Sequence, residues 1–130
     1  MFICPHNAGK SQMAQAFFNN YKTQPSSSLK AISAGTTPSS SIHPTVREIM
    51  LEKGFDLTNV VPIKLTVELV QTVGTIVTIG CAPDALPHVD GVEIVEWVLK
   101  EPKDRSVEEA RLVRDEIEQR VKDFIAQNNY

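Results

Sequence analysis

The segment Thr75-Ile76-Val77-Thr78-Ile79 limits the fold of this 130-residue chain more than any other segment does. All five residues are β-branched, and side chains of this kind favour extended strands over helices. A strand of this composition suits a position that is buried on both faces, as strands of parallel sheets are. Parallel strands need long crossover connections, which are usually helices, so the segment predicts an α/β fold.

The rest of the chain alternates between strand and helix patterns, which supports this prediction. Further strands are expected at Phe2–Ile3, at Leu29–Ala34 with Gly35 ending the strand, and at Val92–Val95. Helices are expected from Ser11 to Tyr21, from Pro44 to a C-terminal turn at Gly54, from the N-cap Thr66 to Val70, and after Ser106. Ser106 and Glu109 form a capping-box pattern before the last helix. We therefore expect one domain over residues 1–130, an α/β sandwich with a mostly parallel sheet.

Charge and cysteine content exclude several classes of protein. Thirteen Lys and Arg against sixteen Asp and Glu leave a net charge of −3, which argues against nonspecific binding to nucleic acid. No apolar run approaches the roughly 20 residues that a membrane-spanning helix needs. Two cysteines are too few for a disulfide scaffold, and their spacing fits no zinc motif, so no bound metal is expected. This composition predicts a soluble, cytoplasmic domain with reduced thiols.

The most informative segment is Cys4-Pro5-His6-Asn7-Ala8-Gly9-Lys10-Ser11, which joins the first expected strand to the first expected helix. In such a loop, successive backbone N–H groups converge on an anion at the positive end of the helix. One interpretation is a nucleotide-binding Walker loop, because Gly9-Lys10-Ser11 matches the end of that motif. The motif requires glycine at the position of Cys4, however, and this disfavours the interpretation.

The second interpretation makes Cys4 a nucleophile beneath a bound oxyanion. Inward N–H groups, the helix N-terminus and the cation of Lys10 all stabilise a thiolate at this position. Ser11 is placed to donate a hydrogen bond to that thiolate, Asn7 tolerates a left-handed backbone, and Gly9 gives free geometry beside the anion. An inert core cysteine is the alternative for Cys4 taken alone, but the spacing of its neighbours favours the nucleophile.

The segment Phe2–Phe18 resembles the start of the low-molecular-weight tyrosine phosphatase family, in particular the arsenate reductases built on that fold. Their loop commonly reads Cys-x-His-Asn-Ala-Gly-Arg-Ser-Gln-Met-Ala. Similar stretches follow at Ser33–Thr36, Pro44–Asp56, Ile79–Cys81, Trp97–Pro102 and Val113–Ile117. The resemblance implies a three-layer sandwich around a four-stranded parallel sheet. It also implies that the oxyanion is bound by Pro5, His6, Asn7, Ala8, Gly9 and Lys10, and that the catalytic residues are Cys4, Lys10, Ser11 and Glu101.

Two of these positions depart from the family pattern. The family's loop arginine is here Lys10, which offers one mobile point charge instead of a planar fork that grips two oxygens. We expect oxyanion binding to survive through the backbone N–H groups and transition-state stabilisation to suffer. The family's general acid is an Asp before Pro, and the matching residue is Glu101, one methylene longer. An exposed loop carboxylate without a catalytic role is an equal alternative for Glu101.

The cysteine pattern also departs from that of some relatives. Reductases coupled to thioredoxin pass a disulfide along three cysteines, of which Cys4 and Cys81 match two, while Leu86 occupies the third position. Cys81 follows a buried strand at the sheet edge where ligands bind, so it is a candidate redox partner of Cys4. An inert buried thiol is the alternative for Cys81. Regeneration then requires an external reductant, either a small thiol such as glutathione or a redoxin, and no bound cofactor is expected.

The resemblance therefore predicts an arsenate reductase-like enzyme that converts arsenate to arsenite with an external thiol. A low-molecular-weight phosphotyrosine or aryl phosphatase is the nearest alternative. In that case Glu101 protonates the leaving oxygen and water hydrolyses the cysteinyl phosphate. Because the loop cation is Lys10, a catalytically weakened oxyanion-binding protein is a third alternative. The expected partner is a small oxyanion, arsenate or phosphate, or a phosphorylated protein.

Overall fold

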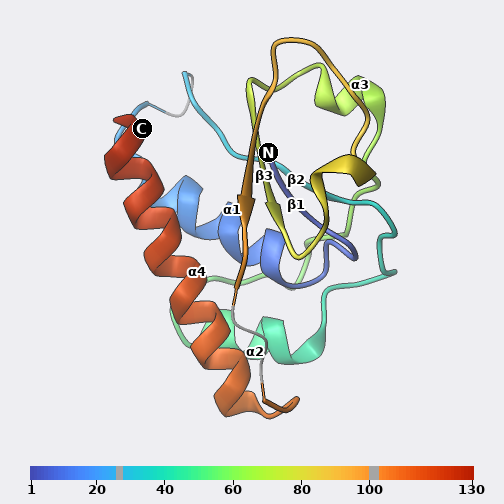
Figure 1. The fold of residues 1–130 in the computed structure, drawn as a ribbon. Helices are drawn as coiled ribbons and strands as arrows, with labels where there is room; N and C mark the ends of the chain where they lie inside the picture. The colour runs from blue at the N-terminus through green and yellow to red at the C-terminus, as the bar shows by residue number, and fades with distance from the viewer. Residues whose placement is uncertain (26–27, 100–102) are drawn as a thin grey trace.

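The computed structural model describes residues 1–25, 28–99 and 103–130. Its elements in chain order are β1 (Phe2–Cys4), α1 (Lys10–Tyr21), β2 (Ser33–Gly35), α2 (Pro44–Leu51), α3 (Val67–Val70), β3 (Thr75–Ile79), the 3₁₀ turn η1 (Pro83–Ala85), β4 (Glu93–Trp97) and α4 (Val107–Asn128). Figure 1 shows α1, α2 and α4 on one side of the sheet and α3 on the other. The predicted three-layer α/β sandwich is confirmed.

The sheet has four parallel strands in the order β2-β1-β3-β4. Its two central strands are buried, β1 throughout and β3 everywhere except at its first residue. The expectation that Thr75–Ile79 is covered on both faces is therefore confirmed. Ile3 of β1 pairs with Thr78 of β3, so the next residue of each strand, Cys4 and Ile79, ends its strand at the same edge of the sheet.

Alternate strand residues supply two separate apolar cores. Phe2, Val77 and Ile79 pack with the side chains of α1, α2 and α4 in the larger core. Ile3 and Ile76 point to the opposite face and belong to the smaller core. Since side chains alternate along a strand, each central strand contributes to both layers, and this is what holds the helices on each face.

The second strand is shorter than expected and shifted along the chain. We predicted a strand at Leu29–Ala34 that ends before Gly35, whereas β2 comprises Ser33–Gly35. Upstream of it, the side chain of Asn19 binds both backbone groups of Ala31. Its Nδ2 donates to the Ala31 carbonyl at 3.0 Å, and its Oδ1 accepts from the Ala31 N–H at 2.8 Å. Residue 31 is therefore unable to join the ladder, and the strand begins later.

The other boundaries follow the sequence closely. β4 covers Glu93–Trp97 instead of Val92–Val95, because it pairs residue for residue with all five positions of β3. Helix α1 begins at Lys10, one residue earlier than expected. Gly54 follows α2 with φ of 87°, which is the left-handed conformation of a C-terminal turn. The hydroxyl of Thr66 accepts from the N–H of Leu69, so α3 has its predicted N-cap.

The capping box predicted for α4 forms only in part. Ser106 Oγ accepts a hydrogen bond from the N–H of Glu109 at 3.2 Å, as the pattern requires. The reciprocal contact is absent within the described residues, because the N–H of Ser106 donates to Asp104 Oδ1 at 2.8 Å instead. The local Asp-x-Ser turn therefore takes the place of the second half of the box.

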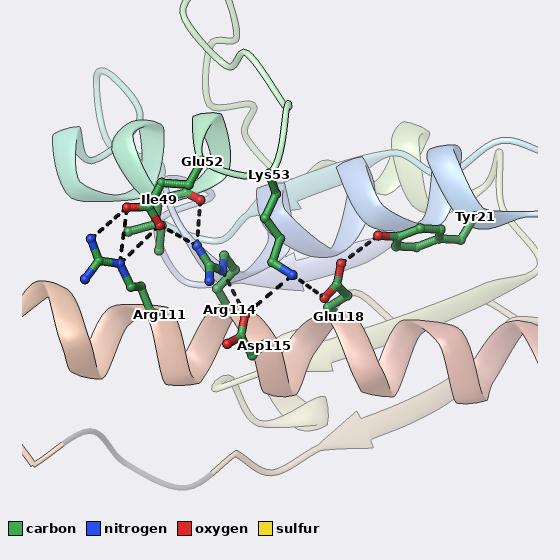
Figure 2. A network of polar contacts seen from close by, with 8 residues as sticks. All are labelled: Tyr21, Ile49, Glu52, Lys53, Arg111, Arg114, Asp115 and Glu118. Atoms are coloured by element: carbon green, nitrogen blue, oxygen red, sulfur yellow. Dashed lines mark hydrogen bonds and ion pairs between the residues drawn. The ribbon is translucent and has the colours of Figure 1, made fainter.

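Charged side chains join α2 and α4 outside the larger core, and Figure 2 shows this network. Glu52, just after α2, accepts hydrogen bonds from Arg111 at 2.7 Å and from the buried Arg114 at 2.8 Å. Lys53 donates to Glu118 at 2.9 Å, and the hydroxyl of Tyr21 donates to the same carboxylate at 2.6 Å. The network fixes α4 against the end of α2 and against α1.

We expect acid to weaken this network at Glu52 first. Hydrogen bonds from Arg111 and Arg114 lower the pKa of Glu52 from its ordinary 4.5 to about 2. A lowered pKa in the folded state means that the pairing stabilises the fold above about pH 4.5 and is lost as the pH falls toward 2. Glu52→Gln should therefore lower the Tm at pH 7, and the difference from wild type should shrink on acidification. Thermal unfolding monitored by circular dichroism checks this. Glu48→Gln, one turn earlier on α2, should not reproduce the pH dependence.

Candidate oxyanion-binding site

The loop between β1 and α1 lies at the carboxyl end of a central strand, where parallel sheets place their ligand sites. It begins at Cys4, whose side chain is 5% exposed, and runs through the fully buried Asn7 and Ala8. It ends at the first turn of α1, whose unpaired N–H groups attract negative charge. The chain thus places a buried thiol beside the positive end of a twelve-residue helix.

A hydrogen-bonded chain connects the loop to the Cys4 sulfur. Cys4 Sγ lies 2.9 Å from Ser11 Oγ, and Asn7 Nδ2 donates to the same hydroxyl oxygen at 2.7 Å. Because that oxygen accepts from Asn7, its hydrogen is available to donate to the sulfur. Ser11 and Asn7 are both fully buried, so water does not compete for these contacts. A donor held in this way stabilises negative charge on the sulfur.

Asn7 holds the loop in shape from within. Its φ of 48° is left-handed, as expected for this residue. The side-chain oxygen of Asn7 accepts hydrogen bonds from Gln12 Nε2 and from the N–H of Ile63, both at 2.9 Å. Sequence reasoning missed Gln12 and Ile63. The available signal was a polar residue on the inward face of α1, where Gln12 is 4% exposed.

The segment 37–43 forms an outer wall around the loop. Three of its N–H groups donate to loop carbonyls: Thr37 to Pro5 at 2.8 Å, Ser39 to His6 at 3.0 Å and His43 to Ala8 at 3.1 Å. The ring Nδ1 of His6 also lies 3.0 Å from the Thr37 carbonyl oxygen. These contacts turn the carbonyl oxygens outward, away from the position of an anion, which is the orientation that an oxyanion cradle needs.

Gly35, at the end of β2, leaves the space that the loop occupies. A Cβ at this position would lie 2.7 Å from the carbonyl oxygen of Pro5 and 2.9 Å from the backbone nitrogen of Asn7. Both distances are shorter than real Cβ contacts, and both involve backbone atoms that have no freedom to rotate away. In the sequence Gly35 suggested only the end of a strand, whereas in the structure it determines how closely β2 approaches the loop.

Lys10 extends from the start of α1 toward the end of β3. Its Nζ lies 3.6 Å from the position that a Cβ on Gly80 would take. Together with Cys81, Glu96 and Trp97, it lines an open cavity of about 280 Å³ beside the loop. The structure therefore brings the predicted loop residues from Cys4 to Ser11 and the predicted redox partner Cys81 to one edge of the sheet.

Cys81 lies close to Cys4, and both are free thiols. Its sulfur is 3.7 Å from the carbonyl oxygen of Ile3, the residue that precedes Cys4. Burial raises the pKa of the Cys81 thiol, and the negative charges of Cys4 and Glu96 raise it further. Negative charge on the Cys4 sulfur thus opposes ionisation of the Cys81 thiol.

We expect alkylation to distinguish the two thiols. Because the pKa of Cys81 is raised above its ordinary 9.0, iodoacetamide should modify Cys4 first near neutral pH and Cys81 only under alkaline conditions. Cys4→Ser removes one of the charges that raise the Cys81 pKa, so the alkylation profile of Cys81 should shift to lower pH. Peptide mass spectrometry across a pH series measures both profiles. An unchanged Cys81 profile in Cys4→Ser would show that the two sulfurs do not interact.

The remaining predicted positions fall elsewhere. Glu101 and Pro102 lie outside the described residues. Leu86, at the position of a third cysteine, is partly buried against the smaller apolar core. Within residues 1–25, 28–99 and 103–130 there is no cluster of three or more His, Cys, Asp or Glu that would hold a metal ion. Over the same ranges, no helix has both the length and the apolar character needed to cross a bilayer.

Residues 1–129 match the family model described as low molecular weight phosphotyrosine protein phosphatase. The chain belongs to this family. Over 128 residues it is 31% identical to the glutaredoxin arsenate reductase of Synechocystis, covering 97% of this chain and 95% of that protein. Membership confirms the resemblance inferred from the loop and identifies the protein as an oxyanion-handling enzyme of the phosphatase and arsenate reductase class.

Solved structures agree with this assignment. The thioredoxin-dependent arsenate reductase Cg_ArsC1' of Corynebacterium glutamicum superposes with a TM-score of 0.79 at 33% identity. The match covers 97% of this chain but only 59% of the Corynebacterium chain. An arsenate reductase solved in the phosphate-binding state superposes with a TM-score of 0.75 at 28% identity, covering 98% of this chain and 95% of the other.

Proposed function

We propose that the protein is an arsenate reductase that uses Cys4 as nucleophile and Cys81 as the second thiol. The observation that carries this proposal is the position of Cys81, whose sulfur lies 3.7 Å from the carbonyl that precedes Cys4. Hydrolysis of a phosphoester at Cys4 needs one thiol, whereas two-electron reduction of arsenate needs two. The similarity to relatives named as glutaredoxin and thioredoxin-dependent arsenate reductases supports the same choice.

In the first step the loop binds arsenate and Cys4 attacks it. The N–H groups of residues 6–9 and of the start of α1 hold the oxyanion oxygens, and Lys10 supplies the neighbouring cation. The Cys4 thiolate forms a bond to arsenic, and one arsenate oxygen leaves as water after protonation. The hydroxyl of Ser11 stabilises the thiolate before this attack, since it is the donor within 2.9 Å of the sulfur.

In the second step Cys81 completes the reduction. When the Cys4 sulfur bonds to arsenic, its negative charge moves to the oxygens that the loop holds, so one of the charges that raise the pKa of Cys81 is reduced. The Cys81 thiolate then attacks the Cys4 sulfur, and the sulfur–arsenic bond breaks with its electron pair staying on arsenic. As(V) becomes As(III) and leaves as arsenite, while the two thiols are oxidised to one disulfide. An external thiol reduces this disulfide.

Phosphatase activity is the second candidate, and the Cys4 loop itself favours it because phosphate and arsenate have the same tetrahedral shape and charge. In that reaction Glu101 takes the part of the general acid that protonates the leaving oxygen. Cys81 has no part in such a hydrolysis. The two activities therefore differ in their dependence on Cys81.

The test compares wild type, Cys4→Ser and Cys81→Ser in two assays. One assay measures arsenite release with dithiothreitol as reductant, and the other measures hydrolysis of p-nitrophenyl phosphate. Cys4→Ser should abolish both activities, whereas Cys81→Ser should abolish arsenite release and retain any hydrolysis of the aryl phosphate. Arsenite release by Cys81→Ser at the wild-type rate would exclude the role of Cys81. Hydrolysis without arsenite release in wild type would identify a phosphatase instead.

A further inference from the structure

The cavity beside the loop carries opposite charges on two of its walls. Lys10 comes from the start of α1 and Glu96 from β4, and both line this 280 Å³ space together with Cys81. The cavity is open to solvent, and Gly80 and Ala82 contribute no bulky side chain to its lining. A cation and an anion that line one cavity together with a thiol match a small ligand that itself carries both charges.

The accessible sulfur of the proposed disulfide belongs to Cys81. Cys4 is 5% exposed, and it is not among the residues that line the cavity. Cys81 is partly exposed and does line it. Since thiol–disulfide exchange depends on which sulfur the attacking thiolate can reach, an external thiol in this cavity meets Cys81 first. The departing Cys4 thiolate returns to the Ser11 hydroxyl and the loop N–H groups.

The segment after Cys81 is held in place by hydrogen bonds and apolar packing. The turn η1 is closed by hydrogen bonds from the N–H of Ala85 to the Ala82 carbonyl and from the N–H of Leu86 to the Pro83 carbonyl. Leu86 and Val89 then pack against the smaller apolar core. Residues 1–130 contain two cysteines, and the position that holds a third in three-cysteine relatives is Leu86. The reductant must therefore come to Cys81.

We infer that this cavity binds a small zwitterionic thiol of the glutathione class, with Lys10 contacting a carboxylate and Glu96 contacting the ammonium. The inference rests on the proposed function and specifies its reductant. The bound thiolate attacks the Cys81 sulfur, the Cys4–Cys81 bond breaks, and its electron pair leaves on Cys4. A second molecule of the thiol attacks the mixed disulfide, which releases the oxidised thiol dimer and restores the Cys81 thiolate. Two thiols are oxidised for each protein disulfide reduced.

The test uses Cys4→Ser, in which Cys81 is the only thiol, and measures how fast it forms a mixed disulfide. The two probes are glutathione disulfide, which is charged, and hydroxyethyl disulfide, which is neutral. The measured quantity is the ratio of the two rates, followed by mass spectrometry. The same thiolate attacks both probes, so any change in the Cys81 pKa cancels in the ratio. Glu93→Gln is the matched control, because Glu93 lies on the same strand but lines a different depression, between β4 and α4.

Glu96→Gln is the decisive variant, because two explanations of a charge effect predict opposite results. If Glu96 binds the ammonium, its neutralisation should lower the rate ratio by about two- to fivefold, the range of a partly exposed ion pair. If the cavity only responds to the net negative charge of glutathione, neutralising Glu96 should raise the ratio. Lys10→Gln should lower the ratio in either case, and Glu93→Gln should leave it unchanged.

An unchanged or increased ratio in Glu96→Gln would overturn the inference. It would also be overturned if the oxidised wild-type protein were reduced by a protein redoxin while glutathione showed no preference over a neutral thiol. Failure of the proposed function has a different signature, because it would appear as no arsenite release with dithiothreitol. The exchange assay does not involve arsenate, so its result stands independently of that outcome.

Discussion

Lys10→Arg should raise turnover of arsenate, or of an aryl phosphate, by roughly 30- to 900-fold. In the trigonal-bipyramidal transition state a guanidinium contacts two equatorial oxygens, whereas an ammonium holds one well. A lost charge-assisted contact of this type costs about 2–4 kcal/mol at a desolvated site, which corresponds to this range of rates. The cavity beside Gly80 leaves room for the larger side chain. Steady-state kinetics of arsenite release measures the change.

Two controls keep this prediction specific to the transition state. The rise in Tm caused by phosphate or arsenate should change much less than turnover, because the backbone N–H groups that bind the ground state are unaltered. Cys4→Ser in the Lys10→Arg background should abolish the gain. If turnover stays flat while Cys4 remains reactive to iodoacetamide, Lys10 is not what limits the rate. That outcome would direct attention to Glu101 and favour a protein that binds oxyanions without efficient chemistry.

Gly35→Ala should lower turnover by about a hundredfold and weaken the stabilisation that oxyanions give. The new methyl group would lie 2.7 Å from the Pro5 carbonyl oxygen and 2.9 Å from the Asn7 nitrogen, so the loop must move. Overpacking of this kind costs about 1–3 kcal/mol of folding free energy. A displacement of about 1 Å at a reacting centre costs about a hundredfold in rate. Urea unfolding, thermal shift with phosphate and arsenite release measure the three effects.

Gly74→Ala is the matched control for the same change of residue. No atom lies within 4 Å of a Cβ built on Gly74, and its backbone is not left-handed. This variant should keep turnover, and its stability should be equal to or slightly above that of wild type, because alanine restricts the unfolded chain. If Gly35→Ala behaved like Gly74→Ala, the loop would tolerate a closer approach of β2 than the distances allow.

Much of the fold was predictable because its causes are local in the sequence. Five consecutive β-branched residues identified β3 as a strand buried on both faces. The loop residues from Cys4 to Ser11 indicated an anion site between a strand and a helix, and the structure brings Cys4 and Ser11 into contact. The left-handed backbone of Asn7 was also expected, since few residues other than glycine adopt it readily.

The errors occurred where a side chain distant in sequence competes for backbone groups. Leu29–Ala34 has a strand pattern, but Asn19 on α1 binds both backbone groups of Ala31 and delays the start of β2. In the capping box at Ser106, the Ser106 N–H donates to Asp104 instead of to Glu109. Asp104 is nearer in the chain, and the four-residue pattern does not include it.

The sequence by itself determined that Cys4, Lys10 and Ser11 lie together at a strand–loop–helix junction. Composition and local spacing are sufficient for this, because Cys4, Lys10 and Ser11 are neighbours in the chain. Only the tertiary structure decided what surrounds them. Gly35, Cys81 and Glu96 come from three other strand ends, and parallel pairing brings those ends to one edge of the sheet. This pairing sets how closely Gly35 packs against the loop, how strongly the charges near Cys81 interact, and how solvent reaches the Cys81 sulfur. The spacing of residues along the sequence does not determine these distances.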